Sequence, residues 1–155
     1  MKYYESLERK LDSLKKKFPS FLNKNNDYTY GRIISIREAN PSRSLVHGFC
    51  SGRETDRKDC MAMGIMFHGT HKDSVGPIVR DGIYEMSRFT NSFYYAVGRS
   101  QYKHGRCSRE DAQVIAFAVL VEDYDRLDWK DAKTRSPCRD HALPLFIISV
   151  RQHHL

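Results

Sequence analysis

The chain has 155 residues, of which 40% are hydrophobic and 29% are charged, and its formal net charge is +7. This composition excludes a chain too polar to fold, and the length suits one domain with a buried core. No apolar stretch approaches the roughly 20 residues that a membrane-spanning helix needs, so we expect no membrane partner. The positive charge favours an anionic partner such as RNA, DNA, a nucleotide or an acidic protein, although a solvated basic surface accounts for it as well.

The N-terminal segment MKYYESLERK lacks the apolar core of a signal peptide, so we expect an intracellular protein of the cytoplasm or nucleus. Its cysteines have wide and irregular spacings, which does not suggest a disulfide framework. They are Cys50, Cys60, Cys107 and Cys138. His47 lies three residues before Cys50 and Cys60 follows, but this spacing fits no standard zinc pattern, and we predict no metal site.

Residues 3–18 are predicted to form an amphipathic helix, because apolar residues recur every three or four positions. Pro19 is predicted to end this helix. A turn-rich linker follows, and RIISI at residues 32–36 is then predicted to be a strand. LVHGF at residues 45–49 is predicted to be a second short extended segment.

MGIMF at residues 63–67 is a third predicted strand. Asp73 or Ser74 is a suitable N-cap for a helix over residues 74–80. Gly82 supplies the C-terminal stop that such a helix requires.

FYYAV at residues 93–97 is predicted to be the next strand, followed by a short helix around residues 99–103. VIAFAVLV at residues 114–121 is too apolar to alternate, which predicts a strand covered on both faces. Residues 122–142 form a long charged segment, and LFIISV at residues 145–150 is predicted to be the last core strand.

These elements predict a single α+β domain over residues 1–155, with its N-terminal helix within residues 1–24 and its core over residues 32–150. Strands separated by only short helices do not match a regular alternation of strands and long helices.

Three motifs occur in a fixed order along this core: FHGT at residues 67–70, FYYA at residues 93–96 with Tyr102 after it, and ALPLFII at residues 142–148. In this order they resemble the catalytic domain of the poly(ADP-ribose) polymerase (PARP) family, in its compact mono-ADP-ribosyltransferase branch. The resemblance implies an ADP-ribosyltransferase fold of two small, packed, antiparallel-rich sheets with short connecting helices. It also implies NAD as the substrate, a protein or nucleic-acid acceptor, and release of nicotinamide.

The resemblance assigns roles to particular residues. His68 would contact the adenosine-side ribose of NAD, and the backbone N–H and C=O of Gly69 would hold the nicotinamide carboxamide. Tyr94 matches the tyrosine of the second motif, and Tyr102 matches a tyrosine that stacks on the nicotinamide ring. Ile147 falls where polymerising members have a glutamate, so the catalytic set would be His68, Tyr94 and Ile147, and we expect no chain elongation. The other residues expected at the NAD site are Thr70, Arg88 and Tyr95.

The chemistry of these residue types agrees with the roles. Aromatic faces attract a flat, cationic nicotinamide ring, and an imidazole on a rigid strand can hydrogen-bond to a ribose diol. A glycine allows the backbone to approach the carboxamide closely, because it has no Cβ. Without a carboxylate at residue 147, a general base must come from the acceptor or from another residue.

Other interpretations of the same residues remain. His68 and the tyrosines are also ordinary core residues of an α+β domain. Residues 87–92 lack the glycines of the family's donor loop, which favours an inactive PARP-like module that binds protein or RNA. GIYEMSR at residues 82–88 resembles a segment of NAD-using RNA 2′-phosphotransferases. If this chain were such an enzyme, its Arg106 or Arg109 would supply a second phosphate ligand. That family also has an N-terminal Arg-His pair, which this chain lacks.

Overall fold

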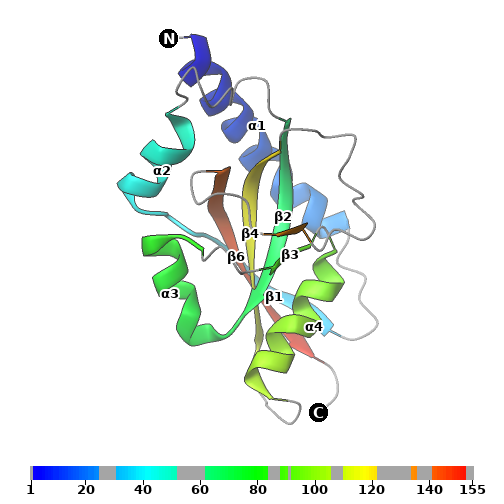
Figure 1. The fold of residues 1–155 in the computed structure, drawn as a ribbon. Helices are drawn as coiled ribbons and strands as arrows, with labels where there is room; N and C mark the ends of the chain where they lie inside the picture. Colours follow the sequence, from blue (N-terminus) through cyan, green and yellow to red (C-terminus); the bar gives the residue numbers. More distant parts are fainter. Residues whose placement is uncertain are drawn as a thin grey trace.

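The computed structural model describes residues 2–24, 31–51, 62–83, 88–90, 92–105, 110–121, 134–135 and 141–152. In chain order the elements are α1 (Lys2–Lys24), β1 (Gly31–Glu38), α2 (Arg43–Cys50), β2 (Ala62–Thr70), α3 (Lys72–Asp81), β3 (Arg88–Phe89), α4 (Phe93–His104), β4 (Ala112–Val121), β5 (Thr134–Arg135) and β6 (Ala142–Gln152) (Figure 1). The α+β class predicted from the sequence is therefore confirmed. No helix in the described part of the chain is long and apolar enough to cross a membrane.

The sheet at the centre of the molecule has four antiparallel strands in the order β1-β6-β4-β2. The strands β3 and β5 form a two-stranded ribbon of two residues each. Thr90, directly after β3, pairs with Phe67 on the outer edge of β2. Among the described residues, the second sheet consists of this short ribbon alone.

Helices cover both faces of the sheet (Figure 1). One hydrophobic cluster joins α1, α2 and α4 to one face, and a second joins α3 and Phe89 to the other. Residues 114–120 of β4 are all buried, because the two clusters take alternate side chains of this strand. The prediction that VIAFAVLV is covered on both faces is confirmed.

The predicted end of the first helix at Pro19 is wrong, because α1 continues to Lys24. A proline inside a helix removes one backbone hydrogen bond and costs about 3 kcal/mol. Packing on both sides of Pro19 opposes this cost. Phe18 stacks on Phe146 with ring centroids 4.8 Å apart, and Leu22, one turn further, is fully buried.

The predicted extended segment at residues 45–49 is also wrong, because these residues lie within α2. Ser42 caps this helix, its Oγ accepting a hydrogen bond from the backbone N–H of Leu45. Leu45 and Phe49 are both buried, and their spacing of four places them on one helical face. The apolar residues of this segment therefore follow the period of a helix. A window of five residues is too short to distinguish that period from the alternation of a strand.

FYYAV at residues 93–97 is not a strand either, because it forms the first turns of α4. Ser92 caps the helix by accepting a hydrogen bond from the N–H of Tyr95 at 3.2 Å. The buried residues of α4 have helical spacing, since they are Phe93, Ala96, Val97 and Ser100. The predicted helix around residues 99–103 is the second half of α4.

Candidate functional site

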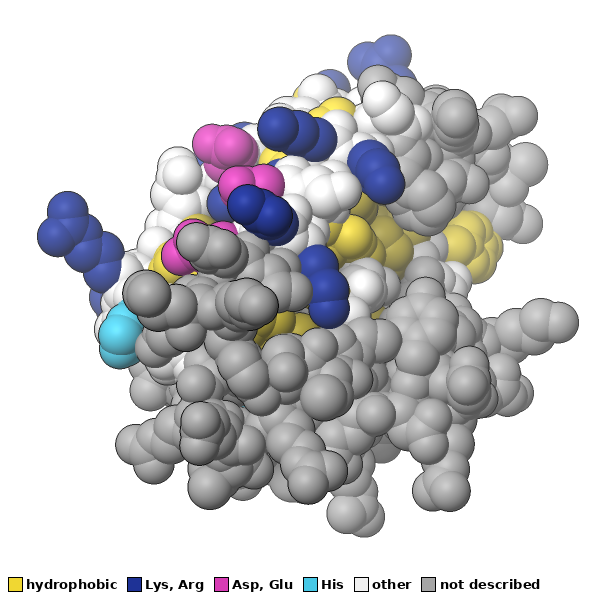
Figure 2. Space-filling view, turned by 90° about the horizontal axis from the view of Figure 1, so that it is seen from above, with side chains coloured by type: hydrophobic (Ala, Val, Ile, Leu, Met, Phe, Trp, Pro, Cys, Tyr) yellow, Lys and Arg dark blue, Asp and Glu magenta, His cyan; other side chains and the backbone are white. Residues whose placement is uncertain are grey.

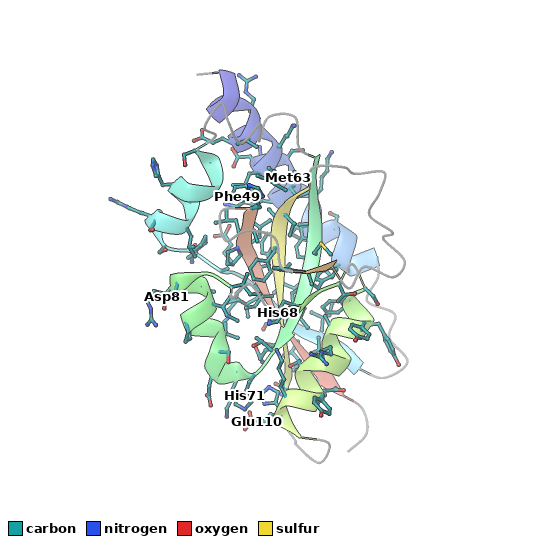
Figure 3. The ribbon with its side chains drawn as sticks, viewed as in Figure 1. Phe49, Met63, His68, His71, Asp81 and Glu110 are labelled. Atoms are coloured by element: carbon teal, nitrogen blue, oxygen red, sulfur yellow. The ribbon has the colours of Figure 1, made fainter. Side chains whose placement is uncertain are left out.

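His68, Gly69 and Thr70 form the last three residues of β2, at the edge of the four-stranded sheet. All three are buried, and His68 is 6% exposed. Neighbouring residues of a strand point to opposite faces, so His68 and Gly69 face different layers of the molecule. Figure 3 shows His68 near the middle of the fold, with His71 and Glu110 further along at the end of the sheet.

His68 belongs to a row of residues that crosses all four strands. It pairs with Ile115 of β4, Ile115 pairs with Ile147 of β6, and Ile147 pairs with Arg37 of β1. Residues paired across a sheet share a face, so His68 and Ile147 lie on the same face, about 10 Å apart across two strand spacings. The structure therefore places these two predicted residues on one surface but not in contact, with a buried isoleucine between them.

The aromatic ring beside His68 belongs to Phe89 of β3. The two ring centroids are 6.2 Å apart, and Phe89 also meets Phe117 edge to face at 4.8 Å. Phe89 is 1% exposed. Phe89 is not among the residues predicted beside His68, because the resemblance assigns the aromatic residue of the second motif to Tyr94. The sequence did contain a signal for this arrangement. Ser92 is a suitable N-cap, which indicates that a helix begins after it and that any strand in this region ends before it.

The predicted tyrosines lie elsewhere. Tyr94, Tyr95 and Tyr102 are on α4, with exposed fractions of 55%, 38% and 70%. The buried face of α4 packs in the cluster that contains Phe67, on the face of β2 that Gly69 shares and His68 does not. The structure therefore does not bring these tyrosines together with His68, and their role at an NAD site stays a prediction.

Gly69 directs its backbone groups to the outer edge of β2. Phe67 exchanges two backbone hydrogen bonds with Thr90 across this edge, with N···O distances of 2.6 and 2.9 Å. In an antiparallel strand alternate residues turn their N–H and C=O to the same side, so Gly69, two residues later, also faces outward. The Nζ of Lys103 donates to the Gly69 carbonyl oxygen at 3.0 Å, and no other described residue donates to it.

A glycine is required at position 69 because α4 lies against it. A Cβ at this position would overlap the carbonyl oxygen of Ala96 and would lie 2.8 Å from the backbone nitrogen of Ser100. The glycine thus brings the backbone of a helix into direct contact with the edge strand. As a result, the Lys103 side chain reaches the same edge.

Ser100 fixes the end of β2 to the end of β4. Its Oγ donates to the carbonyl oxygen of Thr70 at 2.7 Å and accepts from the N–H of Gln113 at 2.8 Å. Thr70 and Gln113 are the last pair of this ladder, so the hydroxyl group completes the ladder where the strands separate. The backbone of Thr70, a predicted NAD contact, is therefore held in place by α4.

Lys103 has an unusual environment for a lysine. Burial lowers the pKa of its ammonium group, and the nearby charge of Arg99 lowers the pKa further. Its contact with the Gly69 carbonyl oxygen partly compensates for the loss of water. The β2 edge therefore has a cation beside it whose proton is held less firmly than usual.

His71 and His104 form a second polar group at the end of β2. Their ring centroids are 4.2 Å apart, and His71 caps α3 by accepting from the N–H of Asp73 at 3.1 Å. Both ring nitrogens of His104 are shielded from solvent and lack a hydrogen-bond partner among the described residues. Next to them, Lys72 and Glu110 form an ion pair of 2.8 Å.

Acid is expected to destabilise the domain through His104. Burial lowers the pKa of His104, and His71 and Lys72 lower it further, whereas Glu110 and Asp73 raise it. The unfolded chain therefore takes up the proton first, so stability is complete above the ordinary pKa of about 6.5 and falls as the pH drops toward the folded pKa. Urea unfolding at pH 7.5 and 5.5 measures this loss.

The variant His104→Gln tests the assignment of this acid sensitivity. It should unfold with a smaller difference between the two pH values than the unchanged chain. His47→Gln, on the exposed side of α2, is the matched control and should keep the full difference. An unaltered pH dependence in His104→Gln would show that other groups cause the acid sensitivity.

Several predicted features lie outside the described residues. They are the side chain of Arg88, the residues Arg106 and Arg109, the cysteines 60, 107 and 138, and most of the segment 122–142. Cys50 is buried. Within the described ranges, no group of three or more His, Cys, Asp or Glu side chains is arranged to hold a metal ion.

Comparison with known proteins adds no family to this geometry. A scan against protein-family models found no match, and a search of curated proteins found none either.

Proposed function

We propose that the chain is an NAD-dependent mono-ADP-ribosyltransferase that transfers ADP-ribose to a protein or nucleic-acid acceptor and releases nicotinamide. The observation that carries this proposal is the outer edge of β2 at Gly69. There, a backbone N–H and C=O face away from the sheet, beside a strand-borne histidine. This is the arrangement that the resemblance of the FHGT motif implies for holding NAD.

The nicotinamide carboxamide presents one acceptor and two N–H donors, which complement the N–H and C=O of a single extended residue. Gly69 suits this role because it has no side chain of its own beside the carboxamide. Lys103 already donates to the Gly69 oxygen, but a carbonyl oxygen has two lone pairs and accepts a second donor. Bound nicotinamide would therefore share this oxygen with Lys103 or displace it.

The other side of the site limits the chemistry to a single transfer. His68 can hydrogen-bond to a ribose hydroxyl, whereas Ile115 and Ile147, next in the same row, are buried aliphatic residues that supply no carboxylate. Loss of nicotinamide leaves an oxocarbenium-like ribose, which an acceptor nucleophile attacks. With no carboxylate at residue 147, the acceptor must supply its own activated nucleophile or use a base outside the row.

Calorimetric titration with NAD tests the proposal. We expect saturable binding by the unchanged chain, its loss in His68→Ala, and its retention in His47→Ala, which alters an exposed histidine of α2. Thermal unfolding of each variant establishes that it is folded. With labelled NAD, the unchanged chain should release nicotinamide and label an acceptor once per site. Absence of binding at millimolar NAD would overturn the proposal.

A second candidate, an inactive module that binds single-stranded RNA, is favoured by the outer face of α4. Tyr95, Arg99 and Tyr102 have the spacing of one helical face, and α4 contains no acidic residue. Exposed aromatic rings beside a cation are typical of surfaces on which bases stack. The net charge of +7 also favours a nucleic-acid partner. On another part of the surface, Figure 2 shows Lys and Arg side chains around an exposed hydrophobic strip.

Fluorescence anisotropy with a labelled single-stranded RNA separates the two candidates. The module predicts salt-sensitive binding that Tyr95→Ala and Tyr102→Ala weaken, in a chain that does not bind NAD. The transferase predicts saturable NAD binding by the unchanged chain, whatever these two changes do to RNA binding.

A further inference from the structure

A cavity of about 480 Å³, here called the α3 pocket, lies between α3, the end of β1 and the middle of β6. This volume is within the range of small-ligand sites, which is about 300–1,000 Å³. It is on the face of the sheet that carries the row from His68 to Arg37, but at the β1 end of that row. The proposed NAD edge is at the other end of the row, about 14 Å away across three strand spacings.

The floor of the α3 pocket is apolar. Ile147 of β6 lies in register with Arg37 of β1, and Ala39 follows Arg37 by two residues, so these side chains share the face that lines the pocket. Val75 and Val79 of α3 form the opposite wall. A ligand with a flat or apolar part would find matching surface there.

The rim of the α3 pocket is cationic. Arg37, Lys72 and Arg80 line it, and Glu38 is the single acidic residue of its described lining. Lys72 pairs with Glu110 and Arg80 pairs with Asp81, whereas Arg37 is exposed and forms no ion pair with a described residue. Arg37 is therefore the group whose charge is available to an anion.

Gly76 keeps the pocket open. It is in the middle of α3, where glycine is less favourable than alanine by about 1 kcal/mol, and a Cβ there would have nothing within 4 Å. Pro77 follows directly, and a residue with a Cβ before proline is disfavoured in a helix, so glycine suits this position for that reason as well. The missing side chain leaves space on the face of α3 that lines the pocket.

We propose that the α3 pocket binds a small phosphate-bearing ligand that also has a flat or apolar group, with Arg37 holding the phosphate and Ala39, Val79 and Ile147 contacting the rest. Arginine is well suited to this role, because its planar guanidinium bonds two phosphate oxygens at once. The pocket shares Ile147 with the expected catalytic set, but Arg37 and the β2 edge lie at opposite ends of the row, so we expect the pocket to hold its ligand whether or not the chain binds NAD.

Calorimetric titration with adenosine 5′-monophosphate tests the inference, with adenosine and inorganic phosphate as partial probes. We expect saturable binding near or below ~1 mM, and much weaker binding of either partial probe. Arg37→Ala should weaken adenosine monophosphate about tenfold, while Arg32→Ala, an exposed arginine of the same strand, should not.

Gly76→Leu should abolish this binding by filling the pocket. Gly98→Leu is its matched control, since Gly98 is also an exposed helical glycine with open space around it. Gly98→Leu favours helix formation, whereas Gly76→Leu places a Cβ before Pro77, and thermal unfolding establishes that both proteins are folded. No binding by the unchanged chain, or full binding by Gly76→Leu and Arg37→Ala, would overturn the proposal. Loss of NAD binding in Gly76→Leu would contradict a separate site.

Discussion

Replacing Gly69 with alanine is expected to destabilise the domain by about 3 kcal/mol, a large part of the stability of a protein of this size. The added Cβ would overlap the carbonyl oxygen of Ala96 and crowd the backbone of Ser100. Both obstacles are backbone atoms of α4, which cannot rotate away as a side chain can. The helix must therefore move off the strand.

Urea unfolding of Gly69→Ala measures this effect, with Gly98→Ala as the matched control. In contrast to Gly69, a Cβ at Gly98 would have nothing within 4 Å, because Gly98 is on the exposed side of α4. Gly98→Ala should therefore stabilise the domain by about 0.5–1 kcal/mol, because alanine is the better helix former. Equal effects of the two changes would mean that α4 does not rest on β2 as described.

Ser100→Ala is expected to cost about 2–4 kcal/mol, because it leaves two buried backbone groups without partners. The carbonyl of Thr70 and the N–H of Gln113 would both lose the hydroxyl that joins them. Ser100 is fully buried, so we expect no easy replacement by water. The end of β2 that carries Gly69 should become less rigid as a result.

Amide hydrogen exchange locates this loss. In Ser100→Ala the amides of residues 68–70 and 113 should exchange faster than those at the centre of β4. Ser149→Ala is the control, since among the described residues its Oγ hydrogen-bonds only to the side chain of Gln113, at 3.2 Å, and its removal should change stability little. If both variants lost stability and exchange protection to the same extent, the hydrogen bonds of Ser100 to Thr70 and Gln113 would not be what holds the end of β2.

The sequence predicted best those elements whose apolar pattern was long or continuous. The strands at residues 32–36, 63–67, 114–121 and 145–150 all exist, each extended by several residues. Gly82 ends α3 as predicted, with a φ of 91° that favours glycine. The helix start differed, because His71 caps it rather than Asp73 or Ser74.

The errors came from segments in which capping and tertiary contacts decide the structure. Ser42 and Ser92 each convert a short aromatic or apolar run into a helix. Pro19 fails to end α1 because Phe18 and Leu22 are buried on either side of it. Neither effect is visible in hydrophobic alternation over five residues.

The candidate site was predictable only in part. FHGT identified the strand that carries His68, Gly69 and Thr70, and the sheet register places Ile147 on the same face as His68. The position of the tyrosines could not be predicted, because it depended on the misassigned strand at residues 93–97. The contact of Lys103 with Gly69 could not be predicted either, since it joins residues 34 positions apart through helix packing.

The most direct test of the account is a nuclear magnetic resonance titration of the ¹⁵N-labelled chain with nicotinamide and then with NAD. If the outer edge of β2 holds the carboxamide, the amide of Gly69 should show one of the largest saturable shifts with both compounds, and those of Phe67 and Lys103 should follow. Shifts confined to other parts of the chain, or no shift at Gly69 with either compound, would contradict the proposed nucleotide site.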